Sequence, residues 1–236
     1  MVEKTKALEA YQEAGEDPKA LECIPMLKRS DIKREAAKII NEELTVDDSL
    51  FLYHDVCTNG IGYVDLMFKT DSIAPEQIPY LGLLKSVLGY VDTENYTYGE
   101  LFNEINANTG GINCGVEVFD RADSTEEFQA MFSVRGKALY TKMDFLFKMI
   151  GEILNSSKLE DTKRLYEIVA SVKSRAQVNL TGAGHSTAVL RAAAYSSPMA
   201  AFQDEMAGIG YYQFIEKLEK DFEQRKEETV EELCKL

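Results

Sequence analysis

The amino-acid sequence predicts an α+β domain in which helices pack on one face of an antiparallel sheet, preceded by a helical arm. Two regions alternate apolar and polar residues with period two, which indicates strands that are buried on one face. The remaining segments have helical periodicity, and no βαβα order or glycine-rich phosphate-binding loop is present. With 236 residues and 45% hydrophobic content, the chain has enough apolar surface for a core. We assign residues 1–45 to the arm and residues 46–236 to the domain.

The predicted arm is polar and has few residues that could form a core of its own. Residues 1–22 are highly charged and read as helix. Pro25 is expected to end one element, and Ser30 or Asp31 is a suitable N-cap for a second helix. An arm of this composition is expected to pack on another part of a protein.

Two hairpins are predicted to form the sheet. The stretches "LFLYHDV" and "IGYVDLMFKT" read as strands on either side of a turn at Asn59-Gly60, a pair typical of tight turns. The stretches "INCGVEVFDR" and "EEFQAMFSVRGKAL" form the second predicted hairpin. The residues expected on the apolar face are Val64, Leu66 and Phe68, then Ile112, Cys114, Val116 and Val118, then Phe128, Ala130, Phe132 and Val134.

Helices are predicted between the two hairpins and throughout the last hundred residues. The "GAGHS" stretch is expected to interrupt this helical block, with Ser186 as the N-cap of the following helix. The final segment begins apolar and is predicted to end as a charged tail. The predicted helical ranges are 75–89, 97–108, 140–154, 161–179 and 186–196, followed by the stretches "SPMAAFQDEMAG" and "GYYQFIEKLEKDFEQRKEETVEELCKL".

Composition and charge argue against several classes of function. The net charge of −14 disfavours binding to nucleic acid or to an anionic membrane, and no basic stripe offsets it. No apolar run approaches the roughly 20 residues that span a bilayer, and the N-terminus does not resemble a signal peptide. We therefore expect a cytoplasmic protein. Its four scattered cysteines are expected to be free thiols.

Residues that could act as nucleophile or base are few. Neither His54 nor His185 lies in a zinc-binding motif. His185 precedes Ser186, but adjacent side chains rarely face each other and no nucleophile elbow surrounds them. Cys57 and Cys114 could be thiol nucleophiles with His54 as base. We favour structural roles for all five, and an unrelated hydrolase using them is a minor alternative.

The polar face of the predicted sheet is the most distinctive candidate surface. It carries a mixture of carboxylates, amides, aromatic groups and methionines, which suits either a solvated face or a wall that faces a peptide. Composition leaves both interpretations open. The candidate substrate-facing residues are Tyr63, Asp65, Asn113, Glu117, Gln129 and Arg135, with Ser133, Met67, Met131 and Phe119 among them.

The order of short motifs is similar to that of a known family. The stretches "ECIPMLKRSDIKREA", "TNGIGYVDLMFKT", "PYLGLLKSVL", "TGGINCGVEVF" and "GAGHSTAVLRAAAYSSPMAAFQDEMAGIGYYQFI" follow one another along nearly the whole chain. In this order they resemble the presequence-protease branch of the insulinase/pitrilysin zinc metallopeptidases. The TNGI stretch, the TGGI strand entry and the GHS…SP…G-x-x-Y-Y-x-F tract are the most specific matches.

This resemblance implies an architecture and a place within it. Such enzymes have four homologous α+β domains in two halves, which are joined by a helical hairpin and close over unstructured peptides. Zinc lies in the first domain, on a helix with an inverted His-x-x-Glu-His motif. The chain would correspond to the second part of the linker and the third, non-catalytic domain. Its implied partners are the remaining peptidase domains and peptide substrates.

The stretch "PYLGLL" stands where the catalytic domain carries its zinc motif. Tyr80, Leu83 and Leu84 occupy the positions of the two histidine ligands and the glutamate base. Because two leucines supply neither a ligand nor a base, the resemblance implies zinc in the parent enzyme and no cofactor in this segment. The predicted function is to wall the degradation chamber and help to bind substrate. The alternative is a stand-alone peptide- or protein-interaction module that has lost protease activity.

Overall fold

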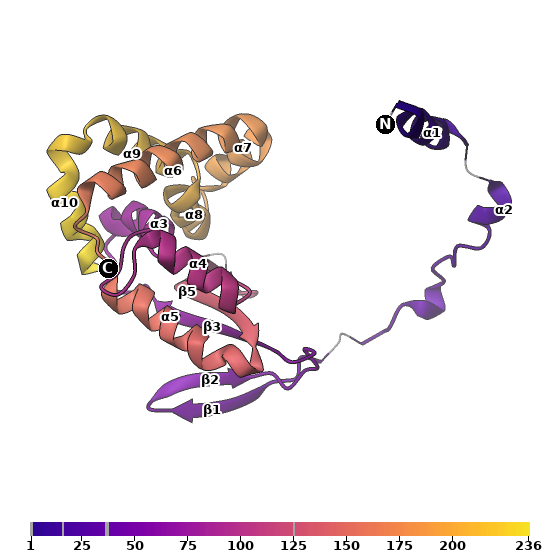
Figure 1. The fold of residues 1–236 in the computed structure, drawn as a ribbon, viewed down its shortest axis with the longest axis horizontal. Helices are drawn as coiled ribbons and strands as arrows, with labels where there is room; N and C mark the ends of the chain where they lie inside the picture. Colours follow the sequence, from indigo (N-terminus) through magenta and orange to yellow (C-terminus); the bar gives the residue numbers. More distant parts are fainter. Residues whose placement is uncertain (1, 16, 36–37, 125) are drawn as a thin grey trace. The chain divides into compact units, whose positions relative to one another are not determined.

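The computed structural model describes residues 2–15, 17–35, 38–124 and 126–236, and its two compact units join at Val56 and Cys57. Both contain antiparallel strands and helices, which confirms the predicted α+β class (Figure 1). Each unit is described by itself. The boundary predicted between residues 45 and 46 falls within a strand of the first unit. No helix in the described ranges has the length and apolar character needed to cross a membrane.

The first unit consists of short, exposed elements. It contains helices α1 (Val2–Glu13) and α2 (Pro18–Leu21), a 3-10 turn η1 (Arg29–Asp31), and strands β1 (Glu42–Val46) and β2 (Ser49–Tyr53). None of the described residues in these elements is buried.

The predicted second helix of the arm is wrong over the residues that the structure describes. An Asp31 carboxylate oxygen accepts a hydrogen bond from the Lys28 backbone N–H at 2.8 Å. This local bond closes a single turn, and residues 32–35 do not continue it as helix. Residues 36–37, which belonged to the predicted helix, lie outside the described residues.

The first predicted hairpin is also wrong, because its two strands have other partners. β2 pairs with β1 through a two-residue loop at Asp47 and Asp48, whose φ values of 47° and 64° are typical of a type I′ turn. Asn59 and Gly60 do form a turn with positive φ, but it leads from an irregular segment into β3. The prediction gave full weight to Asn-Gly and missed Asp-Asp.

The second unit is built on a three-stranded antiparallel sheet. Its strands are β3 (Ile61–Lys69), β4 (Ile112–Asp120) and β5 (Phe128–Leu139), in the order β3-β5-β4. The predicted hairpin of β4 and β5 is confirmed, with Cys114 opposite Val134. β5 is the central strand and buries alternate residues of one face.

Eight helices and two short 3-10 turns complete the described part of this unit. The predicted N-cap Ser186 is wrong, because α7 begins two residues earlier and Ser186 lies within it. The predicted charged tail is an amphipathic helix that buries Phe222, Thr229 and Leu233. The elements are η2 (Pro75–Gln77), α3 (Ile78–Val87), α4 (Tyr98–Asn108), η3 (Tyr140–Lys142), α5 (Met143–Ser156), α6 (Thr162–Gly182), α7 (Gly184–Ala193), α8 (Pro198–Ala207), α9 (Ile209–Lys220) and α10 (Phe222–Lys235).

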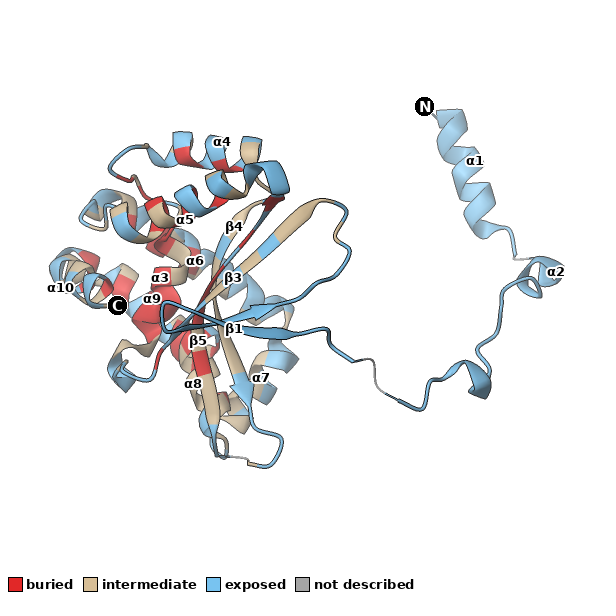
Figure 2. Ribbon diagram, turned by 90° about the horizontal axis from the view of Figure 1, so that it is seen from below, coloured by how far each residue is buried: buried red, intermediate tan, exposed pale blue. Residues whose placement is uncertain are grey.

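The core of the second unit lies between the sheet and the helices, with α3 near its centre (Figure 2). α3 contacts β4 on one side and α6, α8, α9 and α10 on others. α5 packs closely on β5, because a Cβ at Gly136 would lie 2.6 Å from Leu146. Glycine at this position therefore sets the spacing of helix and sheet.

Candidate functional site

The helix that the family resemblance aligns with the zinc motif is entirely occupied by packing. Tyr80, Leu83 and Leu84 are all buried in the core. The Tyr80 hydroxyl accepts a hydrogen bond from the Arg225 guanidinium of α10 at 2.9 Å, and its ring packs edge-on against Phe214. Burial raises the pKa of Tyr80, and Arg225 acts in the opposite direction. Leucine side chains offer no metal ligand, so this arrangement holds α3 within the core.

Gly82, in the middle of the same helix, allows α9 to approach α3. A Cβ on this residue would lie 2.8 Å from the Tyr211 ring and 3.0 Å from the Met206 carbonyl oxygen. The glycine weakens the helix but permits this contact. Within the described residues, no group of three or more histidine, cysteine or acidic side chains is placed to hold a metal ion.

The polar sheet face contains one cluster of charged side chains. The strand register places Asp65, Arg135 and Asn113 beside one another across all three strands. Arg135 donates to Asp65 at 2.6 Å and forms an ion pair with Glu117 at 3.0 Å. Gly115, which precedes Glu117 by two residues on this face, has no side chain in the path of the guanidinium. The hydrogen bond to Asp65 raises the pKa of Arg135.

The other predicted face residues lie outside this cluster. Tyr63 is exposed opposite Lys137, and the Gln129 amide donates to Asp71 at 2.8 Å. Ser133, predicted to point outward, is only 1% exposed because its neighbours on the face cover it. Asp65, Glu117 and Arg135 are thus the predicted residues that the structure joins directly, as two carboxylates paired with one arginine.

The geometry does not support a nucleophile and base. His185 and Ser186 are exposed neighbours in the first turn of α7, and no hydrogen bond joins their side chains in the described structure. Burial raises the pKa of Cys114 to about 11, so its thiol stays protonated near neutral pH. His54 forms a hydrogen bond with the Ile40 carbonyl at 2.7 Å, as a structural imidazole does.

A buried polar centre in the GHS…SP…G-x-x-Y-Y-x-F tract was not foreseen from the sequence. Asp204 is 1% exposed and accepts hydrogen bonds from the backbone N–H groups of Ile209 and Gly210 at 3.0 and 3.1 Å. It also pairs with the Arg191 guanidinium of α7 at 2.6 Å. Asp204 therefore caps α9 and ties it to α7, which gives part of this tract a structural role.

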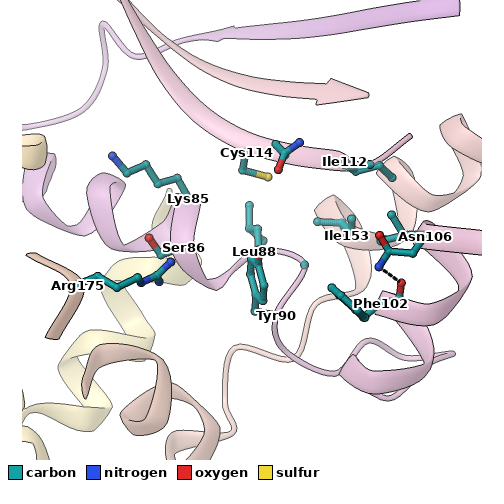
Figure 3. Close-up of a pocket in the computed structure, with 14 residues that line it drawn as sticks. Lys85, Ser86, Leu88, Tyr90, Phe102, Asn106, Ile112, Cys114, Ile153 and Arg175 are labelled. Atoms are coloured by element: carbon teal, nitrogen blue, oxygen red, sulfur yellow. Dashed lines mark hydrogen bonds between the residues drawn. The ribbon is translucent and has the colours of Figure 1, made fainter. Parts of the chain in front are cut away.

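A cavity of about 250 Å³ was also not foreseen. It lies among α3, α4, β4 and α6, and Cys114 and Asn113 line it (Figure 3). Its residues come from separated segments of the chain, so no single sequence motif could have indicated it.

Comparison with known proteins identifies the family. The model of the segment described as associated with peptidases of metallopeptidase family 16, subfamily C, matches residues 1–218. The chain belongs to this family. This peptidase-associated chain is 35% identical over 221 residues to the protein HypA of Clostridium perfringens, covering 94% of the chain and 23% of that protein. It is 29% identical to presequence protease 1, chloroplastic/mitochondrial, of Arabidopsis thaliana, covering 92% of the chain and 20% of that protein.

A mitochondrial presequence protease of Yarrowia lipolytica is likewise 29% identical, over 89% of the chain and 21% of that protein. The resemblance to presequence proteases that the motifs indicated is thereby confirmed. The peptidase-associated chain spans about a fifth to a quarter of the length of these curated relatives.

Proposed function

We propose that the chain acts as a non-catalytic segment of a longer zinc-dependent peptidase that degrades unstructured peptides. In this role it forms part of the chamber wall and helps to bind substrate. The observation that carries the proposal is α3, where Tyr80, Leu83 and Leu84 fill the core at the positions that the resemblance aligns with zinc ligands and base. Zinc hydrolysis requires ligands and a base to activate water, so the chemistry is assigned to another part of the enzyme.

Open strands of the described structure support association with the rest of such an enzyme. β1 and β2 form a two-stranded sheet that exposes Leu44, Phe51 and Tyr53 on one face. A two-stranded sheet gains independent stability by packing its apolar face on something else. β3 and β4 are the two edges of their sheet, and each has one side without a partner strand among the described residues. The remaining peptidase domains are the proposed partners.

The polar sheet face is the proposed substrate contact. Its carboxylates would favour basic peptides, in keeping with the acidic charge of the whole chain. Asp65→Lys and Glu117→Lys in the full-length enzyme should each slow cleavage of basic peptides more than that of neutral ones. Asp120→Lys is the matched control, because alternation places it on the opposite face of the sheet. Equal kinetics in all three variants would remove the substrate role from this face.

A split-enzyme experiment tests the central proposal. The parent peptidase is prepared without this segment, and the purified chain is then added in trans. We expect the chain alone to bind no stoichiometric zinc and to cleave no peptide, and we expect its addition to restore cleavage by the remainder. Phe51→Asp should impair restoration, whereas Glu43→Gln, on the other face of the same hairpin, should not.

Two results would contradict this assignment. One equivalent of zinc in the purified chain, with chelator-sensitive cleavage, would show that the segment is catalytic by itself. Full activity of the remainder without the chain would instead favour a separate peptide- or protein-interaction module.

A further inference from the structure

The cavity among α3, α4, β4 and α6 has one polar end and one apolar end. Lys85, Ser86 and Arg175 line the polar end, and Figure 3 shows the Arg175 side chain directed toward Ser86. Phe102 and Ile112 lie at the opposite end. Apolar walls between them come from Leu88, Ile105 and Ile153, and Tyr90 stands beside them. This polarity suits a ligand with one charged and one apolar part.

The two cations at the polar end have no anionic partner in the described part of the chain. Neither Lys85 nor Arg175 forms an ion pair with any residue that the structure describes, although the chain carries 40 acidic residues. Burial lowers the pKa of Lys85, which means that its surroundings disfavour the charged form. A bound anion would offset this cost and accept hydrogen bonds from both side chains.

A buried hydroxyl next to this end also lacks a partner among the described residues. Tyr211 is 5% exposed, and its hydroxyl makes no hydrogen bond with a described residue. Burial raises the pKa of Tyr211, whereas Arg175 and the Ser86 hydroxyl act to lower it, so these groups lie near one another. No hydrogen bond of acceptable geometry joins Ser86 to Tyr211. Donors therefore collect at this end without acceptors to match them.

The size and the apolar surface of the cavity limit what accompanies the anion. The volume of about 250 Å³ is below the usual range for drug-sized ligands, so a single residue is the appropriate scale. Tyr90 and Phe102 are both exposed at the cavity and offer aromatic surface to an entering side chain.

We propose that this cavity binds the free α-carboxylate of an apolar residue. The carboxylate would lie between Arg175, Lys85 and Ser86, and the apolar side chain would lie against Leu88 and Phe102. Two sources carry this chemistry: the C-terminal residue of a peptide and a free acylated amino acid. The site uses only side chains of this chain, and it does not depend on zinc or on another peptidase domain.

Calorimetric titration of the purified chain tests the site. The ligands are N-acetyl-phenylalanine and its amide, together with Gly-Gly-Gly-Phe as free acid and as amide. We expect saturable binding of the free acids, with each amide about tenfold weaker because it lacks the charge that Arg175 and Lys85 recognise. Tighter binding of the tetrapeptide would identify peptide termini as the source, and equal binding would identify the residue alone.

Charge-removing variants test which side chains hold the carboxylate. Arg175→Gln and Lys85→Met should each weaken binding of the free acid about tenfold, and the methionine keeps the apolar stem of the lysine. Lys163→Gln is the matched control, because Lys163 is an exposed cation of α6 outside the cavity. Thermal melts of all variants verify folding.

The proposal is overturned if no saturable binding occurs, if acid and amide bind equally, or if Lys163→Gln weakens binding as much as Arg175→Gln. Because the titration uses the chain alone, such a result leaves the split-enzyme experiment unaffected. Likewise, failure to restore the parent peptidase does not alter the titration.

Discussion

Replacement of Asp204 is expected to destabilise the helical part of the second unit more than an ordinary cap mutation does. Its carboxylate accepts from two backbone N–H groups at the start of α9 and pairs with Arg191 of α7. Because Asp204 is almost fully buried, alanine at this position would leave those donors without an acceptor and with restricted access to water.

The expected loss follows from the three interactions. A buried donor left unsatisfied costs about 1–3 kcal/mol, and the Gly210 N–H is the more buried of the two. Arg191 is 39% exposed, so it can be hydrated once its partner is gone and adds less. We therefore expect Asp204→Ala to lower the free energy of unfolding by about 3 kcal/mol. Arg191→Gln should cost about 2 kcal/mol, because it leaves the carboxylate buried without its counter-charge.

Urea unfolding followed by far-ultraviolet circular dichroism measures these losses, since the chain has no tryptophan to report by fluorescence. The matched control is Ser197→Ala, which removes one hydrogen bond from the half-buried cap of α8 and should cost about 1 kcal/mol. The double variant Asp204→Ala, Arg191→Gln should be less destabilised than the sum of its parts. A loss for Asp204→Ala no larger than that for Ser197→Ala, or full additivity, would refute the reasoning.

Three further outcomes are expected. Gly82→Ala should lower stability by about 1–2 kcal/mol in urea unfolding, since overpacking against Tyr211 exceeds the gain in helix propensity; a more stable variant would contradict this contact. The folded Cys114 thiol keeps its proton between pH 9 and about 11, where the unfolded thiol loses it. Stability should therefore fall with rising pH across this range, and less steeply in Cys114→Ala. Arg135→Gln should strengthen binding of a basic peptide about twofold to fivefold in titrations, and unchanged affinity would count against an accessible carboxylate pair.

Periodicity in the sequence was a good guide wherever local pattern and burial agree. The β4–β5 hairpin and helices α3 to α6 all follow from alternating or helical apolar residues that face the core. The pattern is less informative in the first unit, where no described residue of a helix or strand is buried. There the choice between Asn59-Gly60 and Asp47-Asp48 as the hairpin turn depends on backbone conformation, which composition indicates only weakly.

The candidate sites divide along the same physical line. The register of one sheet face follows from alternation, so Asp65, Glu117 and Arg135 could be placed together before any coordinates were known. Their mutual neutralisation could not, because it depends on side-chain reach across Gly115. The cavity at Lys85 and the Asp204 centre join segments that are distant in sequence, and only tertiary packing brings these together.

The glycine and the leucines of α3 together explain how a helix at the zinc-motif position can serve a different purpose. A metal-binding helix must keep polar side chains directed into an accessible site. In this chain Leu83 and Leu84 are buried instead, and Gly82 brings Tyr211 of α9 against the helix. The same contact places the Tyr211 hydroxyl beside Ser86, one turn further along α3. The packing that excludes a metal site at the start of α3 therefore also assembles the polar end of the cavity after it.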